Sequence, residues 1–333
     1  MSGVELVGWG SASPDARLTN EDLAARVETS DAWIVERTGI RERRIAAAGE
    51  TTATLASAAG RRALERADVD PADVDLLVVA TVTPDQPLPH TGAYVGEALG
   101  LGCGSFDLHA ACAGFVYASV VAAGMVGAGY RHVLVIGAET LSRITDPTDR
   151  ATCILFGDGA GAALYRTTDG PGSLVAWDLG CDGGAADLLT IPAGGSRLPT
   201  STATLAARQH FLQMDGQQVF KRAVRAVVAS AELTMARAGT TAGDIAWFVP
   251  HQANQRIIEA AADRLGLRDR VISNLDRFGN TSSASIPLAL FEAVDDGRVQ
   301  PGDLLLTTGF GAGMTWASAL LRWTGGARAA DRH

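Results

Sequence analysis

The chain lacks the residue patterns that mark several large classes of protein. Its 28 Lys and Arg stand against 37 Asp and Glu, and no cluster of basic residues offsets the net charge of −9. This balance argues against a nucleic-acid-binding surface. The cysteines form no CxxC pair and the six histidines lack metal-ligand spacing, so we expect reduced cysteines and no metal site. The four cysteines are Cys103, Cys112, Cys153 and Cys181.

Membrane-directing patterns are also missing. Residues 1–6 contain no basic region followed by an apolar core, which is not typical of a signal peptide. The longest uncharged stretch, 110–130, is rich in Gly and Ala and lies between apolar strand-like runs. This composition favours a helix buried inside a layered protein over a membrane span. We therefore expect a cytoplasmic protein that does not interact with a membrane.

Apolar strand-like runs alternate with Ala-rich helical segments along the 333 residues. This alternation predicts an α/β fold, and the length suits one large or two medium domains. The predicted strands are 75–81, 105–108, 132–137, 159–165, 245–249 and 303–308.

An internal repeat divides the chain. Residues 67–79 resemble 238–250, since each segment is a helix end, a turn with Asp at the same place and a buried strand. A looser match relates 99–101 to 265–267. Two similar α/β halves, 1–168 and 169–333 with the boundary near 167–172, imply a pseudo-twofold fold with its chemistry at the junction. Coincidence between two common helix-turn-strand units is the alternative.

Cys112 follows an apolar run that breaks into small residues and then into an uncharged, helix-like segment. A cysteine in the first turn of a helix is exposed to the positive end of the macrodipole and to unpaired backbone N–H groups, which favour the thiolate. The small neighbours would let a substrate carbonyl come close. A packed, inert cysteine is the alternative, and this segment alone does not decide between the two.

Three later segments carry possible chemistry. His251 ends a predicted buried strand, a position that points into the crevice of an α/β sheet. Asn280 lies in a loop of small residues, where its amide can donate hydrogen bonds without titrating. The run 307–316 leaves a strand into a glycine-rich loop that exposes backbone N–H groups. Taken singly, each also fits a satisfied core histidine, a turn asparagine and a flexible hairpin.

Taken together, Cys112, His251 and Asn280 resemble the Cys-His-Asn triad of the β-ketoacyl-acyl-carrier-protein synthase III family, in the thiolase-like superfamily. HQAN at 251–254 followed by GNTSSAS at 279–285 is the most specific part of the resemblance. It spans nearly the whole chain, including 28–34, 37–43, 146–150 and 156–161. A papain-like protease shares the three residue types, but its local sequence contexts are absent.

The resemblance implies a thiolase-like fold in which two pseudo-twofold-related halves form five αβαβα layers. It also implies a reaction. Cys112 takes an acyl group from acyl-CoA, which is a substrate, while the backbone N–H groups of Cys112 and Ala312 form the oxyanion hole. Malonyl-acyl-carrier protein then loses CO₂, His251 and Asn280 donate hydrogen bonds to the enolate, and a 3-oxoacyl-carrier protein results, as in the initiation of fatty-acid synthesis. The resemblance implies no metal and no redox cofactor, because the malonyl carboxylate supplies the driving force.

The same resemblance assigns the substrate-binding residues. The residues expected to bind CoA are Thr29, Trp33, Arg37, Arg150, Met214, Gly216, Phe220 and Asn254, with Trp33 and Arg150 on either side of the adenine. Those expected to dock the carrier protein are Lys221, Gln252 and Arg256. Those expected to line the acyl pocket are Leu88, Phe310 and Met314. Family members are homodimers, and we expect the loop around Leu88 of one subunit to close the pocket of the other.

The sequence departs from the family pattern at four places. Ala312 replaces a glycine, and Leu88 and Met314 stand where aromatic residues are common, which favours longer or branched primers. His109 replaces a small residue, and we interpret it as structural. Two alternatives to the synthase are a ketosynthase-like acyltransferase or starter-unit enzyme of a secondary-metabolite pathway, and a non-catalytic carrier-protein binder. The sequence predicts neither the primer nor the pathway.

Overall fold

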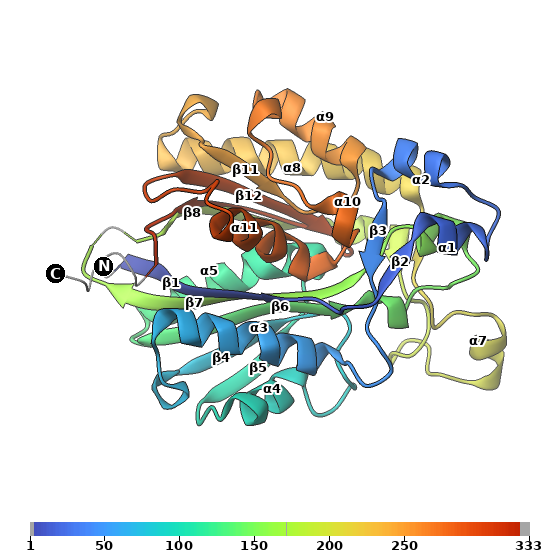
Figure 1. The fold of residues 1–333 in the computed structure, drawn as a ribbon, viewed down its shortest axis with the longest axis horizontal. Coiled ribbons are helices and arrows are strands. Elements are labelled where there is room, and N and C mark those ends of the chain that lie inside the picture. Colours follow the sequence, from blue (N-terminus) through green and yellow to red (C-terminus); the bar gives the residue numbers. More distant parts are fainter. Residues whose placement is uncertain (1–2, 171, 327–333) are drawn as a thin grey trace.

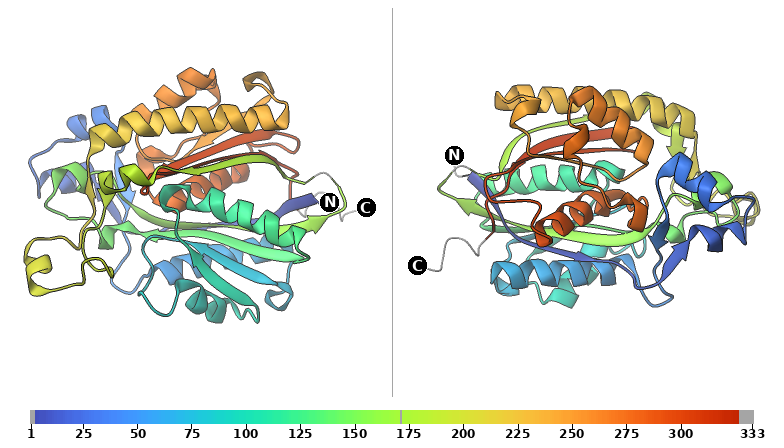
Figure 2. Two further views of the ribbon diagram at one scale, coloured as in Figure 1. Left: turned by 180° about the vertical axis from the view of Figure 1, so that it is seen from behind. Right: turned by 45° about the horizontal axis from the view of Figure 1, so that its top comes forward.

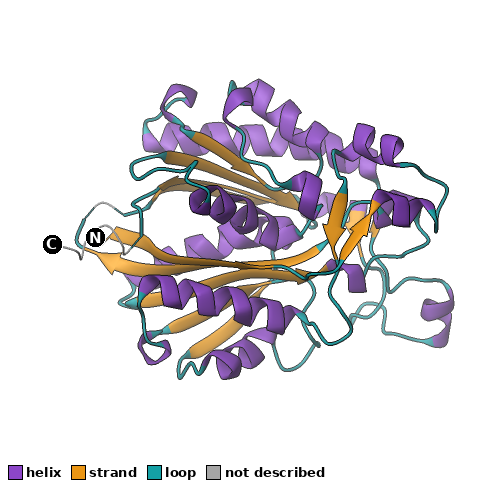
Figure 3. Cartoon of the chain, viewed as in Figure 1, coloured by secondary structure: helices purple, strands orange, loops and turns teal. Residues whose placement is uncertain are grey.

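The computed structural model describes residues 3–170 and 172–326. Two stacked sheets alternate with three layers of helices (Figures 1 and 3). Helices α3 and α4 cover the outer face of one sheet, α8 and α9 cover the outer face of the other, and α5 and α11 lie between the sheets. The predicted five-layered αβαβα arrangement is confirmed. These helices are α3 (Thr52–Ala67), α4 (Thr91–Leu99), α5 (Gly114–Gly127), α8 (Gly216–Ala238), α9 (Gln255–Leu265) and α11 (Ser285–Asp295).

The larger sheet has the strand order β1-β7-β6-β4-β5. β4 runs parallel to β5 and β6, whereas β7 is antiparallel to both β6 and β1. Every residue of β4 is buried, which explains its continuous apolar sequence. The strands are β1 (Gly3–Ala12), β4 (Leu76–Ala80), β5 (Gly104–Leu108), β6 (His132–Thr140) and β7 (Asp158–Thr168).

The smaller sheet repeats this pattern with the order β11-β12-β13-β8. β11 is parallel to β12, and β13 is antiparallel to both β12 and β8, so the four strands correspond to β4, β6, β7 and β1. A parallel bridge between Phe248 and Val271 stands in the place of β5. The strands are β8 (Leu174–Cys181), β11 (Trp247–Pro250), β12 (Leu304–Gly311) and β13 (Thr315–Arg322).

The pseudo-twofold repeat therefore extends well beyond the two short segments that predicted it. The second, looser match is also structural, because α4 and α9 both end at a left-handed glycine, Gly100 and Gly266. β7 ends at Thr168 and β8 begins at Leu174, so the expected boundary falls between strands of different sheets.

The six predicted strands are present, but β1, β8 and β13 were not predicted. The run 307–316 forms a hairpin, but not the glycine-rich loop that its composition suggested. β12 continues through Gly311, and a short turn leads directly into β13 at Thr315. The glycines thus lie in a paired strand and its turn rather than in a long loop.

Shorter elements gather at one end of the sandwich, opposite the two termini (Figures 1 and 2). They are β2 (Arg17–Thr19), α1 (Asn20–Ala24), α2 (Asp31–Thr38), β3 (Glu42–Arg44), α6 (Arg150–Cys153), β9 (Leu189–Thr190), α7 (Thr202–Ala206), β10 (Gln213–Met214) and α10 (Leu275–Phe278). The uncharged stretch that suggested a buried helix contains α5, in the central layer. In the described part of the chain, every helix is too short or too polar to cross a membrane.

β1 packs unusually closely on α3. A Cβ atom at Gly10 would collide with the backbone oxygen of Ala59, and one at Gly8 would collide with that of Ala63. Ala59 and Ala63 are themselves fully buried. Small residues on both sides let the helix backbone rest on the strand, so a larger side chain has no space to enter.

We predict that Gly10→Ala destabilises the protein by about 1–3 kcal/mol, because the added methyl group forces β1 away from α3. Gly96→Ala is the matched control, since a Cβ there meets nothing within 4 Å and alanine favours the helix by about 0.5–1 kcal/mol. Chemical denaturation measures both changes. Equal effects at the two positions would contradict this account of the β1–α3 contact.

Candidate active site

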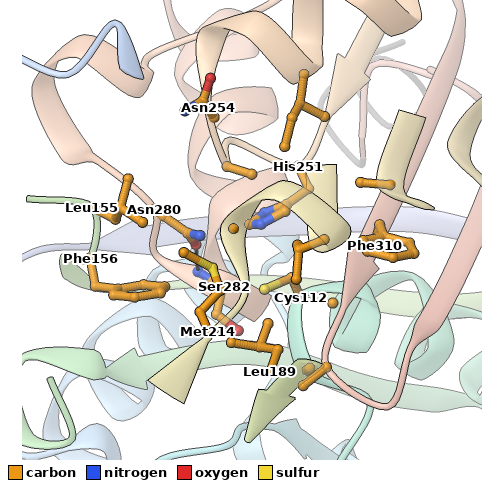
Figure 4. A pocket seen from close by; sticks show the side chains of 18 of the residues that line it. Cys112, Leu155, Phe156, Leu189, Met214, His251, Asn254, Asn280, Ser282 and Phe310 are labelled. Carbon is orange, nitrogen blue, oxygen red and sulfur yellow. Dashed lines mark hydrogen bonds between the residues drawn. The ribbon is translucent and has the colours of Figure 1, made fainter. Parts of the chain in front are cut away.

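A cavity of about 770 Å³ lies at the junction of the two halves. Cys112 from the first half and His251 and Asn280 from the second all line it, and Figure 4 shows their side chains converging on the same space. The three residues are buried, so their chemistry is largely shielded from bulk water. The structure therefore brings together the three side chains that the sequence singled out.

Cys112 occupies the middle of a single 3-10 turn, Ala111–Ala113, which leads directly into α5. Burial raises the pKa of its thiol to about 12, despite the hydroxyl of Ser282, which acts in the opposite direction. This differs from the expectation that the helix terminus alone would favour the thiolate. In the free protein the desolvation of a charged sulfur is the larger effect, so the resting group is a thiol.

The glycines of β12 lie against the nucleophile turn. A Cβ at Gly311 would come within 2.6 Å of the Cys112 backbone nitrogen, and one at Gly309 within 2.9 Å of the Cys112 backbone oxygen. Because glycine has no Cβ, the backbone of β12 can approach the backbone of the Cys112 turn closely at these two positions. Ala312 follows them with an ordinary negative φ, whereas Gly313 takes the positive one. The alanine is therefore compatible with the turn, and Ala312 lines the cavity beside Cys112.

His251 follows β11 and is held from two directions. Its backbone N–H donates to the Thr308 carbonyl at 2.7 Å, and its Nδ1 lies 2.6 Å from Ser285 Oγ. Ser285 Oγ also accepts the Gln252 backbone N–H at 3.4 Å, which leaves the serine hydrogen free to point at Nδ1. With the serine hydrogen donated to Nδ1, the imidazole proton is on Nε2. Burial lowers the pKa of His251 to about 3, so this ring is a neutral donor.

Asn280 is clamped by the first half of the chain. Its backbone N–H donates to the Leu155 carbonyl at 2.8 Å, and its carbonyl accepts the Gly157 N–H at 2.9 Å. The side-chain Oδ1 accepts the Ser282 backbone N–H at 2.9 Å. Because the oxygen is occupied, the amide Nδ2 is the group left to face the cavity.

A fully buried carboxyl group, Glu139 of β6, ties the two halves together near this site. It accepts hydrogen bonds from the Val82 backbone N–H at 3.0 Å and Thr83 Oγ1 at 2.6 Å, and it lies 2.8 Å from Ser283 Oγ. Burial raises the pKa of Glu139.

Sequence reasoning missed Glu139, Ser282 and Ser285, although the two serines lie inside the GNTSSAS segment that carried the resemblance.

Five residues expected to bind CoA line the cavity: Arg37, Met214, Gly216, Phe220 and Asn254. The other three, Thr29, Trp33 and Arg150, do not line it. The guanidinium carbons of Arg37 and Arg150 lie 4.5 Å and 5.0 Å from the centre of the Trp33 ring, so the three form one stacked cluster. An adenine between Trp33 and Arg150 requires Arg150 to move aside.

Two of the three expected carrier-docking residues are on the surface, and one is buried. Lys221 is exposed on α8, and the half-exposed Arg256 on α9 forms an ion pair with Glu36 at 3.8 Å. Gln252 is a correction, because its side chain is only 1% exposed. Its Nε2 donates to the Pro250 carbonyl and its Oε1 accepts the Ser273 hydroxyl, both at 2.6 Å. Gln252 therefore supports the strand end and cannot contact a carrier protein.

Only one of the three expected acyl-pocket residues lines the cavity. Phe310 lines the cavity, together with apolar residues that sequence reasoning missed, among them Phe156 and Leu189. Met314 is buried in the core of the second half and does not line the cavity. Leu88 is 83% exposed and also lies outside the cavity wall of its own chain.

His109 differs from its structural interpretation. It is exposed and lines the cavity next to Ala110, so it is not a core residue. Across residues 3–170 and 172–326, no three His, Cys, Asp or Glu side chains are grouped so as to hold a metal ion.

Comparisons with known proteins agree with this geometry. The family model of 3-oxoacyl-[acyl-carrier-protein] synthase III matches residues 106–183, and the model of its C-terminal part matches 235–323. A β-ketoacyl-[acyl-carrier-protein] synthase III of Roseiflexus sp. (strain RS-1) is 49% identical over 322 residues, which cover 96% of this chain and 98% of the relative.

Solved structures show the same relationship. A β-ketoacyl-[acyl-carrier-protein] synthase III of Thermus thermophilus is 46% identical with a TM-score of 0.90, and the match covers 96% of this chain and 99% of that one. The priming β-ketosynthase of the R1128 polyketide pathway is 40% identical with a TM-score of 0.90, covering 97% and 96%. This chain belongs to the 3-oxoacyl-[acyl-carrier-protein] synthase III family.

Proposed function

We propose that this chain is a condensing enzyme that transfers an acyl group from acyl-CoA to Cys112 and joins it to malonyl-acyl-carrier protein with loss of CO₂. The observation that carries the proposal is the convergence of one thiol and two neutral N–H donors on a single buried cavity. The product is a 3-oxoacyl-carrier protein. A non-catalytic binder has no need of this arrangement.

In the first half-reaction, Cys112 Sγ attacks the thioester carbonyl of acyl-CoA. The backbone N–H groups of Cys112 and Ala312 donate to the oxyanion that develops on the carbonyl oxygen. The carbon–sulfur bond to CoA breaks, and the proton of the Cys112 thiol ends on the departing CoA thiol. The reaction therefore needs no proton from outside the site. This fits a resting thiol that is protonated, because burial raises its pKa to about 12.

In the second half-reaction, the malonyl carboxylate leaves as CO₂ and the electron pair moves onto the thioester as an enolate. His251 Nε2–H and Asn280 Nδ2–H donate to the enolate oxygen. Both donors stay neutral, so no buried cation is created and none has to be removed. The enolate carbon attacks the acyl carbon, and the Cys112 sulfur leaves and takes up a proton.

An alternative within the same chemistry is a starter-unit enzyme of a secondary-metabolite pathway. The similarity to the R1128 priming ketosynthase supports this alternative, since the match covers nearly the whole length of that protein. Leu88 would favour longer or branched primers only if the proposed dimer brings it to the partner's cavity, since it lies outside the cavity wall of its own chain. Turnover of acetyl-CoA against isobutyryl- and longer acyl-CoAs with one malonyl-carrier protein identifies the primer that the enzyme prefers.

We predict that substitutions in the triad separate the two half-reactions. Cys112→Ser abolishes the acyl-enzyme, because a hydroxyl is a poorer nucleophile and leaving group than a thiol. His251→Ala and Asn280→Ala retain acylation but lower malonyl decarboxylation by about 10²–10³, the usual cost of losing one oxyanion donor. Intact mass after incubation with acyl-CoA measures acylation, and CO₂ release measures decarboxylation.

The two assays on each variant also serve as controls for one another. A mass increase of one acyl group on Cys112→Ser would contradict the assignment of the nucleophile. Equal losses of acylation and decarboxylation in His251→Ala would contradict the division of roles between the halves.

We also propose that the carrier protein docks beside Arg256. Its guanidinium is half exposed on α9, whose first turn follows the cavity-lining Asn254, while the chain as a whole carries a net charge of −9. A basic site on a chain of net negative charge suits an acidic carrier protein and the phosphates of CoA. Lys221, on the neighbouring α8, is the second exposed cation of this site.

Arg256→Glu is expected to raise the KM for malonyl-carrier protein several-fold without changing the reactivity of Cys112. Arg61→Glu, an equal charge reversal on α3 in the opposite outer layer, is the control and leaves this KM unchanged. Steady-state kinetics at low salt gives the comparison, since the docking energy is electrostatic. The same KM in wild type and Arg256→Glu would remove Arg256 from the docking site.

We infer that the chain acts as a homodimer. β5 and β8 are the end strands of their sheets, and they lie on the same side of the molecule as α5 (Figure 2, left). Phe106 on β5 is 37% exposed and Trp177 on β8 is 39% exposed. Apolar edge strands of this kind need a partner, and a second copy would also bring its Leu88 loop toward the cavity.

Sedimentation should give a mass near twice the 34.5 kDa of the chain, and Phe106→Arg should shift it to the monomer and lower turnover. The control is Leu205→Arg, which changes an apolar residue on α7 that is 46% exposed. A monomeric wild-type protein with full activity would refute the dimer.

A further inference from the structure

Ser282 is a buried residue of the cavity wall whose hydroxyl has no assigned role. Its side chain is 2% exposed, it lines the cavity with Cys112 and Asn280, and Figure 4 shows it between them. Within the described part of the chain, Ser282 Oγ has no hydrogen-bond partner. A buried hydroxyl without a partner is costly, so its place in a reaction cavity needs a physical explanation.

The pseudo-twofold symmetry shows that the hydroxyl is not required by the backbone. Ser282 begins the 3-10 turn Ser282–Ala284 before α11, just as Ala111 begins the turn Ala111–Ala113 before α5. Both residues have a φ of 46°, in the left-handed region. Ala111 adopts this conformation without a polar side chain. The fold therefore sets the backbone of Ser282, and the hydroxyl is an addition to it.

The local electrostatics identify what the hydroxyl can serve. It favours the charged forms of two neighbours, since it lowers the pKa of Cys112 and of Glu139 against the effect of burial. Glu139 already interacts with Val82, Thr83 and Ser283. The sulfur of Cys112 is different. Among the residues that the structure describes, Ser282 is the one side-chain donor that acts on this sulfur, and burial disfavours its charged form.

We propose that Ser282 is a catalytic residue that donates its Oγ–H to the sulfur of Cys112 whenever that sulfur carries negative charge. It does so when Cys112 attacks acyl-CoA and again when Cys112 leaves the acyl group in the condensation. This proposal rests on the proposed function, in which Cys112 is the acyl-carrying nucleophile. The hydrogen bond forms to the charged sulfur and not to the resting thiol, which fits the unpartnered Oγ in the free protein.

The test is the pH dependence of iodoacetamide alkylation at Cys112, followed on its peptide by mass spectrometry. The wild-type thiol is largely protonated near neutral pH because burial raises its pKa to about 12, so the readout is the alkylation rate at each pH between about 7 and 9. In Ser282→Ala this rate should fall about tenfold at every pH, because a hydrogen bond to a charged group is lost. Ser282→Gly, which suits the left-handed backbone, should give the same loss of rate. Alkylation of the exposed Cys181 in the same samples should not change.

Ser318→Ala is the matched control. Ser318 is also a fully buried serine whose Oγ has no partner in the described structure, but it lies on β13 outside the cavity wall. Its profile should superimpose on that of the wild type. Superimposed profiles for both Ser282 variants, each with a native circular dichroism spectrum, would overturn the proposal. A wild-type protein that acyl-CoA fails to acylate would instead refute the proposed function and leave the alkylation result readable.

Discussion

The site depends on backbone-to-backbone contact between the two halves of the molecule. Gly137 of β6 touches the backbone of Ser283, and Gly309 and Gly311 of β12 touch the turn around Cys112. In each case a Cβ atom would push a strand of one half away from a turn of the other. The distance between Cys112 and the donors His251 and Asn280 therefore follows from how closely two sheets and two central helices can approach.

Close contact of this kind also determines the electrostatics. The cavity is shielded well enough for burial to keep His251 neutral and Cys112 protonated in the resting protein. A neutral imidazole is the form that the decarboxylation needs, because a donor suffices at the enolate oxygen. The same desolvation works against the thiolate, which is why hydrogen-bond donors around the sulfur matter for the acyl-transfer step.

Much of the fold could be predicted because the pattern is local. β4 is buried along its whole length, and its sequence is an unbroken apolar run. The matching helix ends at Gly100 and Gly266 indicate the repeat. β8 and β13 pair with strands far away in the sequence, and their stability comes from those partners. The glycines of β12 suggested a loop because their real partner, the Cys112 turn, is about 200 residues away in the chain.

The sequence by itself determined which chemical groups the protein has and the order in which they occur: a thiol before a small-residue helix, a histidine after a strand and an asparagine in a loop of small residues. Only the tertiary structure decided that Nδ1 of His251 lies against Ser285 Oγ, and that Gln252, although next to His251, is buried away from any partner. It also decided that Met314 lies in the core while Ser282 faces the nucleophile. Protonation and exposure depend on residues that are distant in the chain, and only packing brings those residues together.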